Sequence, residues 1–485
     1  MILFILLTII VSFIIICLIS ERFIIFFKIF SFILTFFIFF YFIILWLYFD
    51  RISNNFQYIE HFLWNDTLNI YYSIGVDGIS ILFLVLTSFL IPFCILYSWY
   101  QYSYFFKEFI VILLLIEFFL INFFSVLDLF FSSIFFEVIL IPMFILIGNF
   151  GSRQRRIHAS FQFFFYTMTG SFSMFLGILL VYLHEGSTDI YVYYYSVYNY
   201  KIQLLLWFFF FISLSVKIPL FPLHLWLPEA HVEAPTIGSV ILAGILLKMG
   251  TYGLLRLVVP VFSFANFFYK PFIFLLTFLS IYYVSLITFC QIDLKKLIAY
   301  SSIAHMGYVT MSLFTFDFVG VQGSIFLMLS HGIVSSLLFF LVGMLYDRYK
   351  TRIIFFYKSL YSIMPNFCLI LFIATLANIG FPGTISFIGE FLILFSFLKI
   401  NKIIFFFNSL GFIISITYSF WLYNRVMSLS FIWFYIYSDL NKREFYIILP
   451  FVLLIFLFGF CPYLILDTLE FSILNLLLTI DINFH

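Results

Sequence analysis

Long apolar runs, separated by short polar segments, follow one another along almost the whole chain. A helix needs about 20 consecutive apolar residues to cross the hydrocarbon core of a bilayer. The pattern therefore predicts an all-α, polytopic membrane protein with about 14 transmembrane helices. The predicted spans are residues 1–20, 23–49, 77–99, 108–125, 127–148, 160–183, 203–230, 236–258, 270–290, 295–315, 320–345, 367–400, 403–425 and 446–470.

Helix-breaking residues interrupt two of these spans. Pro219 and Pro222 lie in the seventh span, and Pro382 and Gly383 lie in the twelfth. Proline removes a backbone donor and clashes with the preceding turn, so a helix must kink or break there. Broken backbone at membrane depth persists only where protein or a water-filled cavity satisfies its polar groups. We therefore predict a discontinuous helix at each place, although the prolines could also merely shape a loop.

The two broken spans occupy equivalent places in two sets of five spans. Each is the fourth of its set, and because five is odd the second set starts on the opposite face of the membrane. Inverted repeats with paired broken helices are typical of transporters; the alternative is two unrelated kinks. The predicted domains are N-terminal transmembrane helices at 1–106, a first five-helix repeat at 107–260, a second, inverted repeat at 261–428 and a C-terminal transmembrane helix at 429–485.

Lysine and arginine are distributed unequally between the two sets of loops. Loops after odd-numbered spans hold 15 of these residues, and loops after even-numbered spans, in which we include Arg256, hold 6. By the positive-inside rule, loops rich in lysine and arginine lie on the inner side of a membrane. The odd-numbered loops are therefore predicted to face inside. Both chain termini are then expected to face outside.

Two lysines remain within the predicted spans. Lys217 directly precedes the first break, and Lys248 lies in the middle of the next apolar run. A lysine at the bilayer centre costs about 2.5–3.5 kcal/mol on insertion scales. Lys217 could instead extend its ammonium to a headgroup. Lys248 is too far from Pro235 and Pro260, at either end of its run, for that explanation.

Ionisable side chains at mid-span form a larger set. They are Glu117, Glu137, Lys217, Lys248, His305, His331 and Glu390. A proton moves only between groups within hydrogen-bond reach or bridged by water, so such a set is typical of a proton pathway. Individually, a buried histidine can be a packing residue and a buried glutamate can be neutral. Together, the seven residues favour proton translocation.

Composition restricts the remaining functions. Hydrophobic residues make up 65% of the chain and charged residues 9%, whereas soluble domains have about 25% charged residues. The net charge of +1 gives no indication of nucleic-acid binding. The five cysteines are far apart and no nucleotide-binding glycine motif is present, so iron–sulfur, zinc and nucleotide sites are not predicted. His224, Glu229, His231 and Glu233 lack the spacing of a zinc helix, so no metal site is predicted.

Five segments resemble a known family. The chain is similar to the mitochondrially encoded chain 4 family of NADH:ubiquinone oxidoreductase (respiratory complex I), an antiporter-like group of membrane subunits. The similarity extends from about Gly75 to Pro462. The segments that carry it are Phe135–Pro142, His224–Pro235, Leu297–Met306, Leu329–Gly332 and Pro382–Phe391.

The resemblance implies roles for the residues that match the family's motifs. Glu137 would pair with Lys217, and Lys248 would be the central proton carrier. Glu390, after the second break, would be the group on the exit side. These are expectations from the resemblance, and they agree with the proton pathway that the mid-span residues indicate.

Further expectations follow from the same resemblance. His305 and His331 match the histidines between the carriers, and Glu117 matches a glutamate of the fourth span. No cofactor is expected in this chain, because NADH, flavin, iron–sulfur clusters and ubiquinone are bound by other subunits. Expected partners are the other membrane-arm subunits, including neighbouring antiporter-like subunits, and lipids such as cardiolipin. The expected location is the mitochondrial inner membrane.

Two alternatives stay open. A stand-alone multisubunit cation/proton antiporter shares the same motifs. A purely structural membrane-arm subunit belongs to a different functional class, but it would have no need for seven ionisable residues at mid-span. The high phenylalanine content and the lack of a soluble extension favour an organelle-encoded complex I chain.

Overall fold

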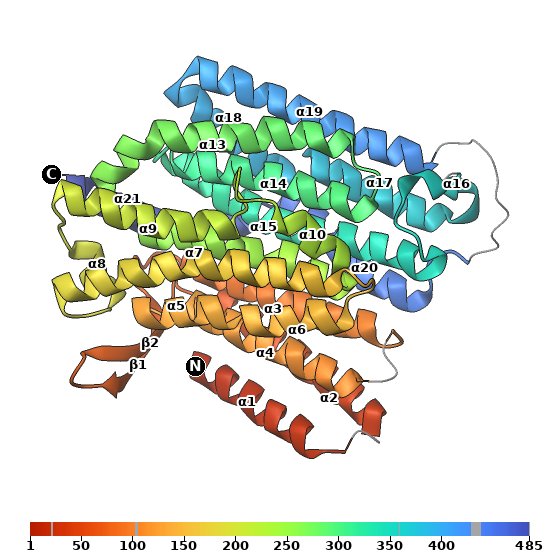
Figure 1. Cartoon of the computed structure of the whole chain (residues 1–485), viewed down its shortest axis with the longest axis horizontal. Coiled ribbons are helices and arrows are strands. Elements are labelled where there is room, and N and C mark those ends of the chain that lie inside the picture. The colour runs from red at the N-terminus through yellow and green to blue at the C-terminus, as the bar shows by residue number, and fades with distance from the viewer. Residues whose placement is uncertain (21–22, 102–104, 358, 428–437, 485) are drawn as a thin grey trace. The chain divides into compact units, whose positions relative to one another are not determined.

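Helices joined by short loops make up nearly all of the structure, a computed structural model that describes residues 1–20, 23–101, 105–357, 359–427 and 438–484 (Figure 1). Within these residues, twelve helices are long and apolar enough to cross a membrane. Two shorter apolar helices, Ile2–Leu18 and Pro365–Ile379, coincide with predicted spans. The predicted all-α, polytopic class is therefore confirmed.

Internal contacts divide the chain into two compact units. Unit 1 consists of Met1–Ile218, Ile245–Lys270 and Asp467–His485. Its elements are α1 (Ile2–Leu18), α2 (Ile24–Leu47), β1 (Gln57–Asn65), β2 (Ile70–Val76), α3 (Gly78–Ser98), α4 (Phe106–Ser125), α5 (Leu129–Val138), α6 (Leu140–Phe150), α7 (Arg156–Glu185), α8 (Ile190–Tyr195), α9 (Tyr200–Lys217), α12 (Leu247–Gly253) and the π-helix η3 (Leu254–Val258). The strands β1 and β2 form an antiparallel hairpin.

Unit 2 consists of Pro219–Gly244 and Pro271–Leu466. Its elements are α10 (Trp226–Glu233), α11 (Thr236–Ile241), α14 (Leu294–Leu313), α15 (Phe318–Tyr349), the 3-10 helix η4 (Ile354–Phe356), α16 (Leu360–Ile363), α17 (Pro365–Ile379), α18 (Ile385–Ile400), α19 (Lys402–Met427) and α20 (Lys442–Phe460). Three further helices begin in one unit and end in the other: the π-helix η2 (Leu242–Leu246), α13 (Ser263–Phe289) and α21 (Tyr463–Phe484). The segment 219–244, which precedes Lys248 in the first predicted repeat, thus has its contacts in unit 2.

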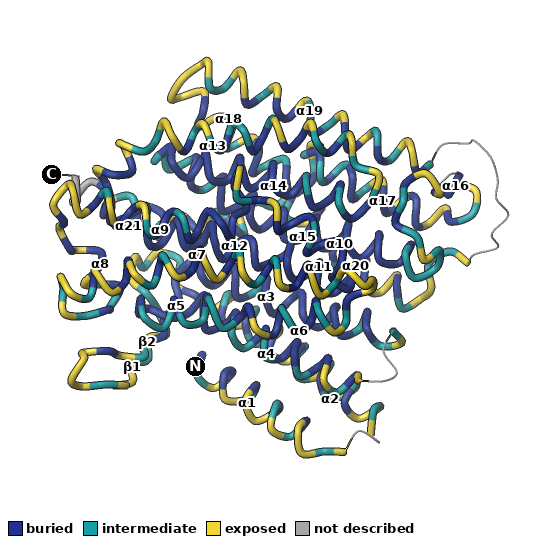
Figure 2. The backbone as a smooth tube through the Cα atoms, in the orientation of Figure 1, coloured by how far each residue is buried: buried dark blue, intermediate teal, exposed yellow. Residues whose placement is uncertain are grey.

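Burial differs strongly between helices (Figure 2). In unit 2, α15 is surrounded by α11, α14, α17, α18 and α20. It is apolar on all sides, as expected of a helix enclosed by others. In unit 1, α3 is the most enclosed of the N-terminal helices, whereas α1 and α2 expose many large apolar side chains. Such exposed apolar faces suit contact with lipid.

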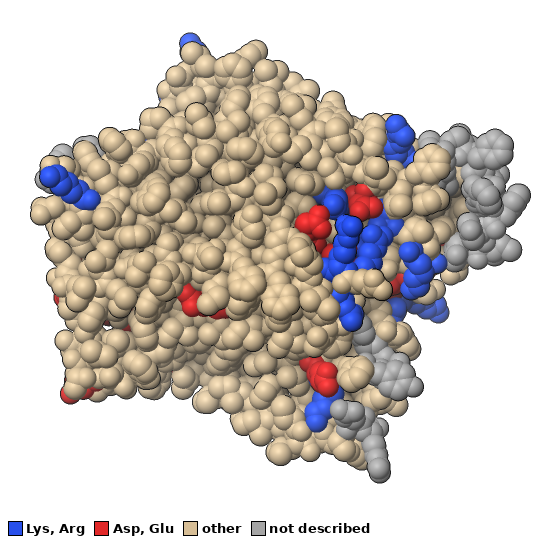
Figure 3. All heavy atoms as spheres, in the orientation of Figure 1, with Lys and Arg blue, Asp and Glu red and all other residues tan. Residues whose placement is uncertain are grey.

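Charged side chains are rare on the surface. Figure 3 shows one face of the molecule, on which few side chains are charged. In unit 2, Asp293 and Ile353 form a β-bridge that joins the start of α14 to the segment after α15. The basic residues predicted for these two loops therefore lie at the same end of unit 2, as the positive-inside rule requires.

The predicted last span, 446–470, is wrong. The structure has two helices there, α20 and α21, separated at Cys461 and Pro462. Pro462 cannot donate a backbone hydrogen bond and so ends the helix. Both helices are long and apolar enough to cross a membrane. The C-terminal region therefore holds two such helices rather than one, and the prediction that both termini face the same side no longer follows.

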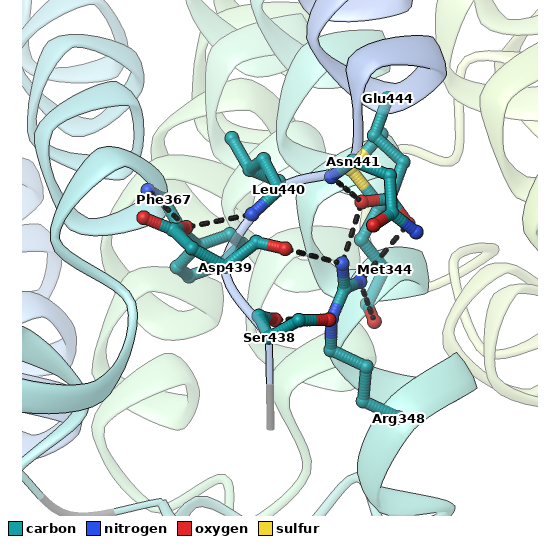
Figure 4. Close-up of polar contacts among 8 residues, drawn as sticks. All are labelled: Met344, Arg348, Phe367, Ser438, Asp439, Leu440, Asn441 and Glu444. Atoms are coloured by element: carbon teal, nitrogen blue, oxygen red, sulfur yellow. Dashed lines mark hydrogen bonds and ion pairs between the residues drawn. The ribbon is translucent and has the colours of Figure 1, made fainter. Parts of the chain in front are cut away.

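An arginine joins the end of α15 to the start of α20 in unit 2 (Figure 4). Arg348, near the end of α15, donates to both carboxylate oxygens of Glu444 at 2.6 and 3.0 Å and to the backbone oxygens of Met344, Ser438 and Asp439. Glu444 also accepts from the backbone N–H of Asn441 and completes a capping box at the start of α20.

Asp439 completes this cluster from its other side. Its carboxylate accepts from the backbone N–H groups of Asn366 and Phe367 at 2.8 and 3.2 Å, which satisfies two orphan donors at the start of α17. The Arg348–Glu444 pair is nearly buried, with 10% and 8% of the two side chains exposed. The cluster thus holds α15, α17 and α20 together at one end of unit 2.

We expect Glu444→Gln to destabilise unit 2. Glutamine keeps the capping box, but Arg348 loses its charged partner, and breaking a buried pair costs about 3–5 kcal/mol. The measurements are the thermal unfolding of the purified protein in its complex and the amount present in membranes. Asp317→Asn is the control, because it removes a more exposed pair with Lys399 and should cost about 0–1 kcal/mol. Equal effects of the two substitutions would contradict the role of the cluster.

Candidate functional site

Lys217 is the last residue of α9, where the first break begins. The side chain is 2% exposed, and its ammonium lies 4.7 Å from the centre of the Phe136 ring. It has no hydrogen-bond partner among the described residues. The predicted break comes directly after Lys217: residues 218–225 are not helical, and α10 starts only at Trp226. The structure therefore contains a buried ammonium held against an aromatic face at the end of a helix.

Glu137 approaches Lys217 without contacting it. Its charge acts on Lys217, but no ion pair or hydrogen bond joins the two in the part of the chain that is described. Glu137 is only partly buried, near the end of α5. Pro142 lacks the N–H that would reach the carbonyl of Val138, and α5 and α6 are separated at this point. The structure thus places the predicted partners close together but not in direct contact.

Lys248 lies between two π-helical segments. It is the second residue of α12, with η2 before and η3 after, and it is fully buried. Single π-turns inside helices occur frequently at functional sites. Side chains in place of Gly250 and Gly253 would collide with Ile218 and Leu214, so α12 packs closely against the end of α9. Lys248 therefore belongs to the helix that packs beside the end of the helix carrying Lys217.

Glu117 lies in α4 and is also fully buried. Neither carboxylate oxygen has a hydrogen-bond partner among the residues that the structure describes. Its charge acts on Cys94 of the neighbouring helix α3. A carboxylate enclosed in this way costs free energy unless it is neutral or hydrated. A side chain that only fills space does not require this cost, so burial of Glu117 agrees with the predicted role in proton exchange.

The three predicted residues of unit 2 come together. Nδ1 of His305 in α14 lies 4.0 Å from Oε1 of Glu390 in α18. The rings of His305 and His331, the latter from α15, have their centres 5.7 Å apart. All three residues are at most 6% exposed. The 4.0 Å between His305 and Glu390 is longer than a direct hydrogen bond but short enough for one bridging water.

The second break brings backbone against Glu390. Gly380, at the end of α17, has a φ of +76°, and a side chain there would overlap the Glu390 carboxylate. Gly383 has a φ of +92° beside Pro382, and its carbonyl is approached so closely by Gly459 of α20 that no side chain would fit at Gly459. The predicted break is therefore present, and glycine is required there for both conformation and space.

The structure brings the predicted residues into two groups. Glu117, Glu137, Lys217 and Lys248 belong to unit 1, and His305, His331 and Glu390 belong to unit 2. A single pathway through all seven stays a prediction. No group of three or more His, Cys, Asp and Glu residues that could hold a metal ion occurs among the described residues.

Several buried charged residues were not predicted as such. Arg256 was assigned to an outside loop, but it lies in η3, is 3% exposed and pairs with Asp77. Lys295 and Arg352, assigned to inside loops, are 1% exposed and donate to backbone carbonyls at the end of α10. For Arg256, its place inside the apolar run 236–258 was a signal that could have been used. For the other two, burial depends on distant segments.

Asp128 directly precedes α5 and caps this helix. Its carboxylate accepts from Thr188 at 2.6 Å and from the N–H of Phe131 at 3.1 Å. Burial raises the pKa of Asp128 to about 6, and these hydrogen bonds oppose the rise. The residue joins the start of α5 to the loop before α8, and it supports the helix that carries Glu137.

Comparisons with known proteins agree with this arrangement. Residues 126–417 match the family model described as NADH:quinone oxidoreductase/Mrp antiporter, transmembrane. The protein named NADH-ubiquinone oxidoreductase chain 4 is 49% identical in Chondrus crispus, over 89% of this chain and 88% of that protein. In Acanthamoeba castellanii it is 50% identical, over 88% of this chain and 87% of that protein.

Solved structures show the same fold. Respiratory complex I from Thermus thermophilus contains a chain with a TM-score of 0.87 and 24% identity, covering 98% of this chain and 100% of that one. The Mrp complex from Dietzia sp. contains a chain with a TM-score of 0.82 and 16% identity, covering 92% of this chain and 91% of that one. From the sequence matches, this chain belongs to the NADH-ubiquinone oxidoreductase chain 4 family, within the wider NADH:quinone oxidoreductase/Mrp antiporter family.

Proposed function

We propose that this chain is an antiporter-like membrane-arm subunit of a proton-pumping NADH:ubiquinone oxidoreductase and that it carries protons through its two buried groups. The names of its sequence relatives support membership of that complex. The observation that carries the mechanism is the presence of Lys217 and Glu117, enclosed in apolar surroundings without hydrogen-bond partners among the described residues. Groups of this kind are costly and mark ion or proton pathways.

Lys217 and Glu137 act as a switch in this proposal. A nearby carboxylate favours the charged ammonium, and separation from it favours the neutral amine. In the structure the two are close enough to interact but are not paired. A small movement that opens the gap would push a proton from Lys217 towards Lys248, and closing the gap would reload Lys217.

The group in unit 2 is proposed to carry protons as well. An imidazole can accept a proton on one nitrogen and donate from the other, so His331 and His305 can pass protons in sequence. Glu390 accepts the proton from His305 through one water, since 4.0 Å exceeds a direct hydrogen bond. The open backbone around Gly380 and Gly383 gives this carboxylate polar surroundings on the exit side.

The chemistry of quinone reduction belongs elsewhere in the complex under this proposal. No cofactor is assigned to this chain; NADH, flavin, iron–sulfur clusters and ubiquinone would be bound by other subunits. Its neighbours would be other antiporter-like subunits, with lipids such as cardiolipin between them. The proposed location is the mitochondrial inner membrane, which the resemblance to the mitochondrially encoded chain 4 family implies.

A stand-alone cation/proton antiporter subunit is the second candidate. The matching family model includes such proteins, and the Mrp structure has the same fold. Identity near 49% to proteins named as complex I subunits favours the first candidate. Copurification of this chain with NADH:ubiquinone reductase activity tests the choice, and copurification with an assembly lacking that activity would contradict it.

We expect Glu137→Gln to stop pumping and Glu137→Asp to retain part of it. Glutamine keeps the shape but removes the charge that acts on Lys217, whereas aspartate keeps the charge with a shorter reach. The measurement is proton pumping driven by NADH oxidation in membranes with matched amounts of assembled complex. If the glutamine variant pumped as well as the aspartate variant, the charge would not be needed and the switch would be wrong.

A further inference from the structure

A second buried charged pair lies in unit 1, apart from the proton-carrying groups. Arg256 of η3 donates from Nη2 to Oδ1 of Asp77, the residue that caps α3. The two side chains are 4% and 9% exposed. Asp77 also accepts from the N–H of Ser80 at 2.9 Å, and its own N–H donates to Oγ of Ser80 at 2.8 Å. The Asp77 carboxylate is therefore bound by the guanidinium of Arg256 and by the backbone N–H of Ser80 at the start of α3.

Aromatic rings enclose the guanidinium of Arg256. Its central carbon lies 5.3 Å from the ring centres of both Phe56 and Tyr252. The hydroxyl of Tyr252 donates to the backbone oxygen of Phe124 at 3.2 Å, which holds this ring in place. Arginine over aromatic faces is favourable when desolvated. The pair thus occupies a packed, apolar pocket.

The pair lies at one end of the helical span that carries Lys248. Arg256 is eight residues after Lys248, about 12 Å along a helix at 1.5 Å per residue. The positive-inside rule predicts that this end faces outside. Backbone pairing also joins segments next to the pair: β2 ends at Val76, Leu127 donates to Ser73, and residues 126–128 bridge to β2 and to Asp189.

Asp77 is the carboxylate at this end that Arg256 contacts, and the backbone pairing described above adds two further carboxylates, Asp128 and Asp189. The phenols whose charges interact with Asp77 are those of Tyr191, Tyr194 and Tyr252, and phenols titrate near pH 10. Arginine does not deprotonate in proteins. An isolated buried carboxylate, by contrast, takes up a proton readily and can release it again. Whether a proton can pass through Asp77 at this end of the Lys248 span therefore depends on whether that carboxylate can bind one.

We propose that Arg256 keeps Asp77 permanently ionised and thereby closes this end of the Lys248 span to protons. The proposal rests on the proposed function, because it assumes that Lys248 carries protons. Burial alone would raise the pKa of Asp77, but the Arg256 guanidinium and the hydrogen bonds from Ser80 outweigh it and hold that pKa below its usual value. A carboxylate that never binds a proton cannot relay one, so Lys248 exchanges protons along the pathway and not with the aqueous phase beyond Asp77.

The test is the passive proton conductance of membranes that contain the whole complex, without NADH. In Arg256→Gln, Asp77 can bind protons, and an imposed pH gradient should collapse several-fold faster than in the native complex. Arg256→Lys keeps a cation and should collapse the gradient at the native rate. Lys201→Gln removes an exposed cation from the first turn of α9 and is the matched control. If the pH gradient collapsed no faster in Arg256→Gln than in the native complex, the proposal would be overturned.

Double variants separate a specific leak from general damage. Asparagine caps helices as well as aspartate does, so Asp77→Asn removes the proton-binding group and keeps the start of α3. Adding Asp77→Asn to Arg256→Gln should restore the slow rate. Adding Lys248→Met to Arg256→Gln should restore it too, because the leak needs both groups. A leak that persists in either double variant would contradict the proposal.

Two further measurements cover the remaining outcomes. If Arg256→Gln does not assemble, infrared spectra of the native complex and of Asp77→Asn are compared at neutral pH. Because Asp77 is ionised in the native complex under this proposal, Asp77→Asn should remove no band of a protonated carboxyl group. Loss of such a band would overturn the proposal. Lys248→Met alone should pump poorly without leaking. Normal pumping by that variant would refute the proposed function, whereas an absent leak in Arg256→Gln refutes only this inference.

Discussion

Lys248→Met is expected to leave the complex assembled and to reduce NADH-driven proton pumping severely. Methionine has a similar length and no charge, so the tight packing of α12 against α9 at Gly250 and Gly253 should survive. Residues 236–258 contain no other lysine and no histidine that could replace the lost amine. Positioned proton-transfer groups contribute about 10²–10⁴-fold to rate, so pumping through this subunit should fall by at least about 10²-fold. The measurement is the pH gradient formed during NADH oxidation.

The control for this prediction is Lys201→Met. Lys201 lies in the exposed first turn of α9, so its replacement removes a lysine without touching the buried groups. Pumping should stay at the native level there, with equal amounts of both variants in the membrane. A native pH gradient in Lys248→Met, at matched amounts of complex, would mean that Lys248 is not a carrier.

Glu390→Gln is expected to have an effect of similar size. Glutamine fits the space against Gly380 but cannot bind and release a proton. His305, 4.0 Å away, would then face an amide, which does not take up a proton near neutral pH. Tyr308 and Tyr418 interact with the charge of Glu390, but phenols do not accept protons near neutral pH. Pumping should therefore fall strongly, and Glu390→Asp should retain part of it.

Glu229→Gln is the matched control in unit 2. Glu229 is a half-exposed residue of α10 that pairs with Lys296 at 3.1 Å, so its loss should leave pumping unchanged. The measurement is proton translocation at equal rates of quinone reduction. Retention of full pumping in Glu390→Gln would show that protons bypass this carboxylate.

The sequence predicted those parts of the site that depend on local signals. Prolines and glycines reveal both breaks, because their effect on a helix acts within a few residues. The cost of charge in an apolar run likewise singles out Lys217, Lys248 and Glu390 without a structure. The same rule indicates His305 and His331, which the structure brings together in unit 2.

The parts that were missed have several causes, and one is contact between distant segments. Arg256 was counted with the loops because its partner, Asp77, lies far away in the sequence. The π-turns around Lys248 have no sequence signature that we could use. Pro462 was overlooked because the apolar runs on both sides of it read as one span. The gap between Glu137 and Lys217 is a matter of side-chain position, which periodicity does not determine.

The number of protons translocated per NADH oxidised tests the central claim most directly. It should be measured in vesicles for the native complex, Lys248→Met and Glu390→Gln, each at the same rate of NADH oxidation. The claim that both buried groups carry protons predicts that each substitution lowers this ratio below the native value. A native ratio in both variants would contradict it.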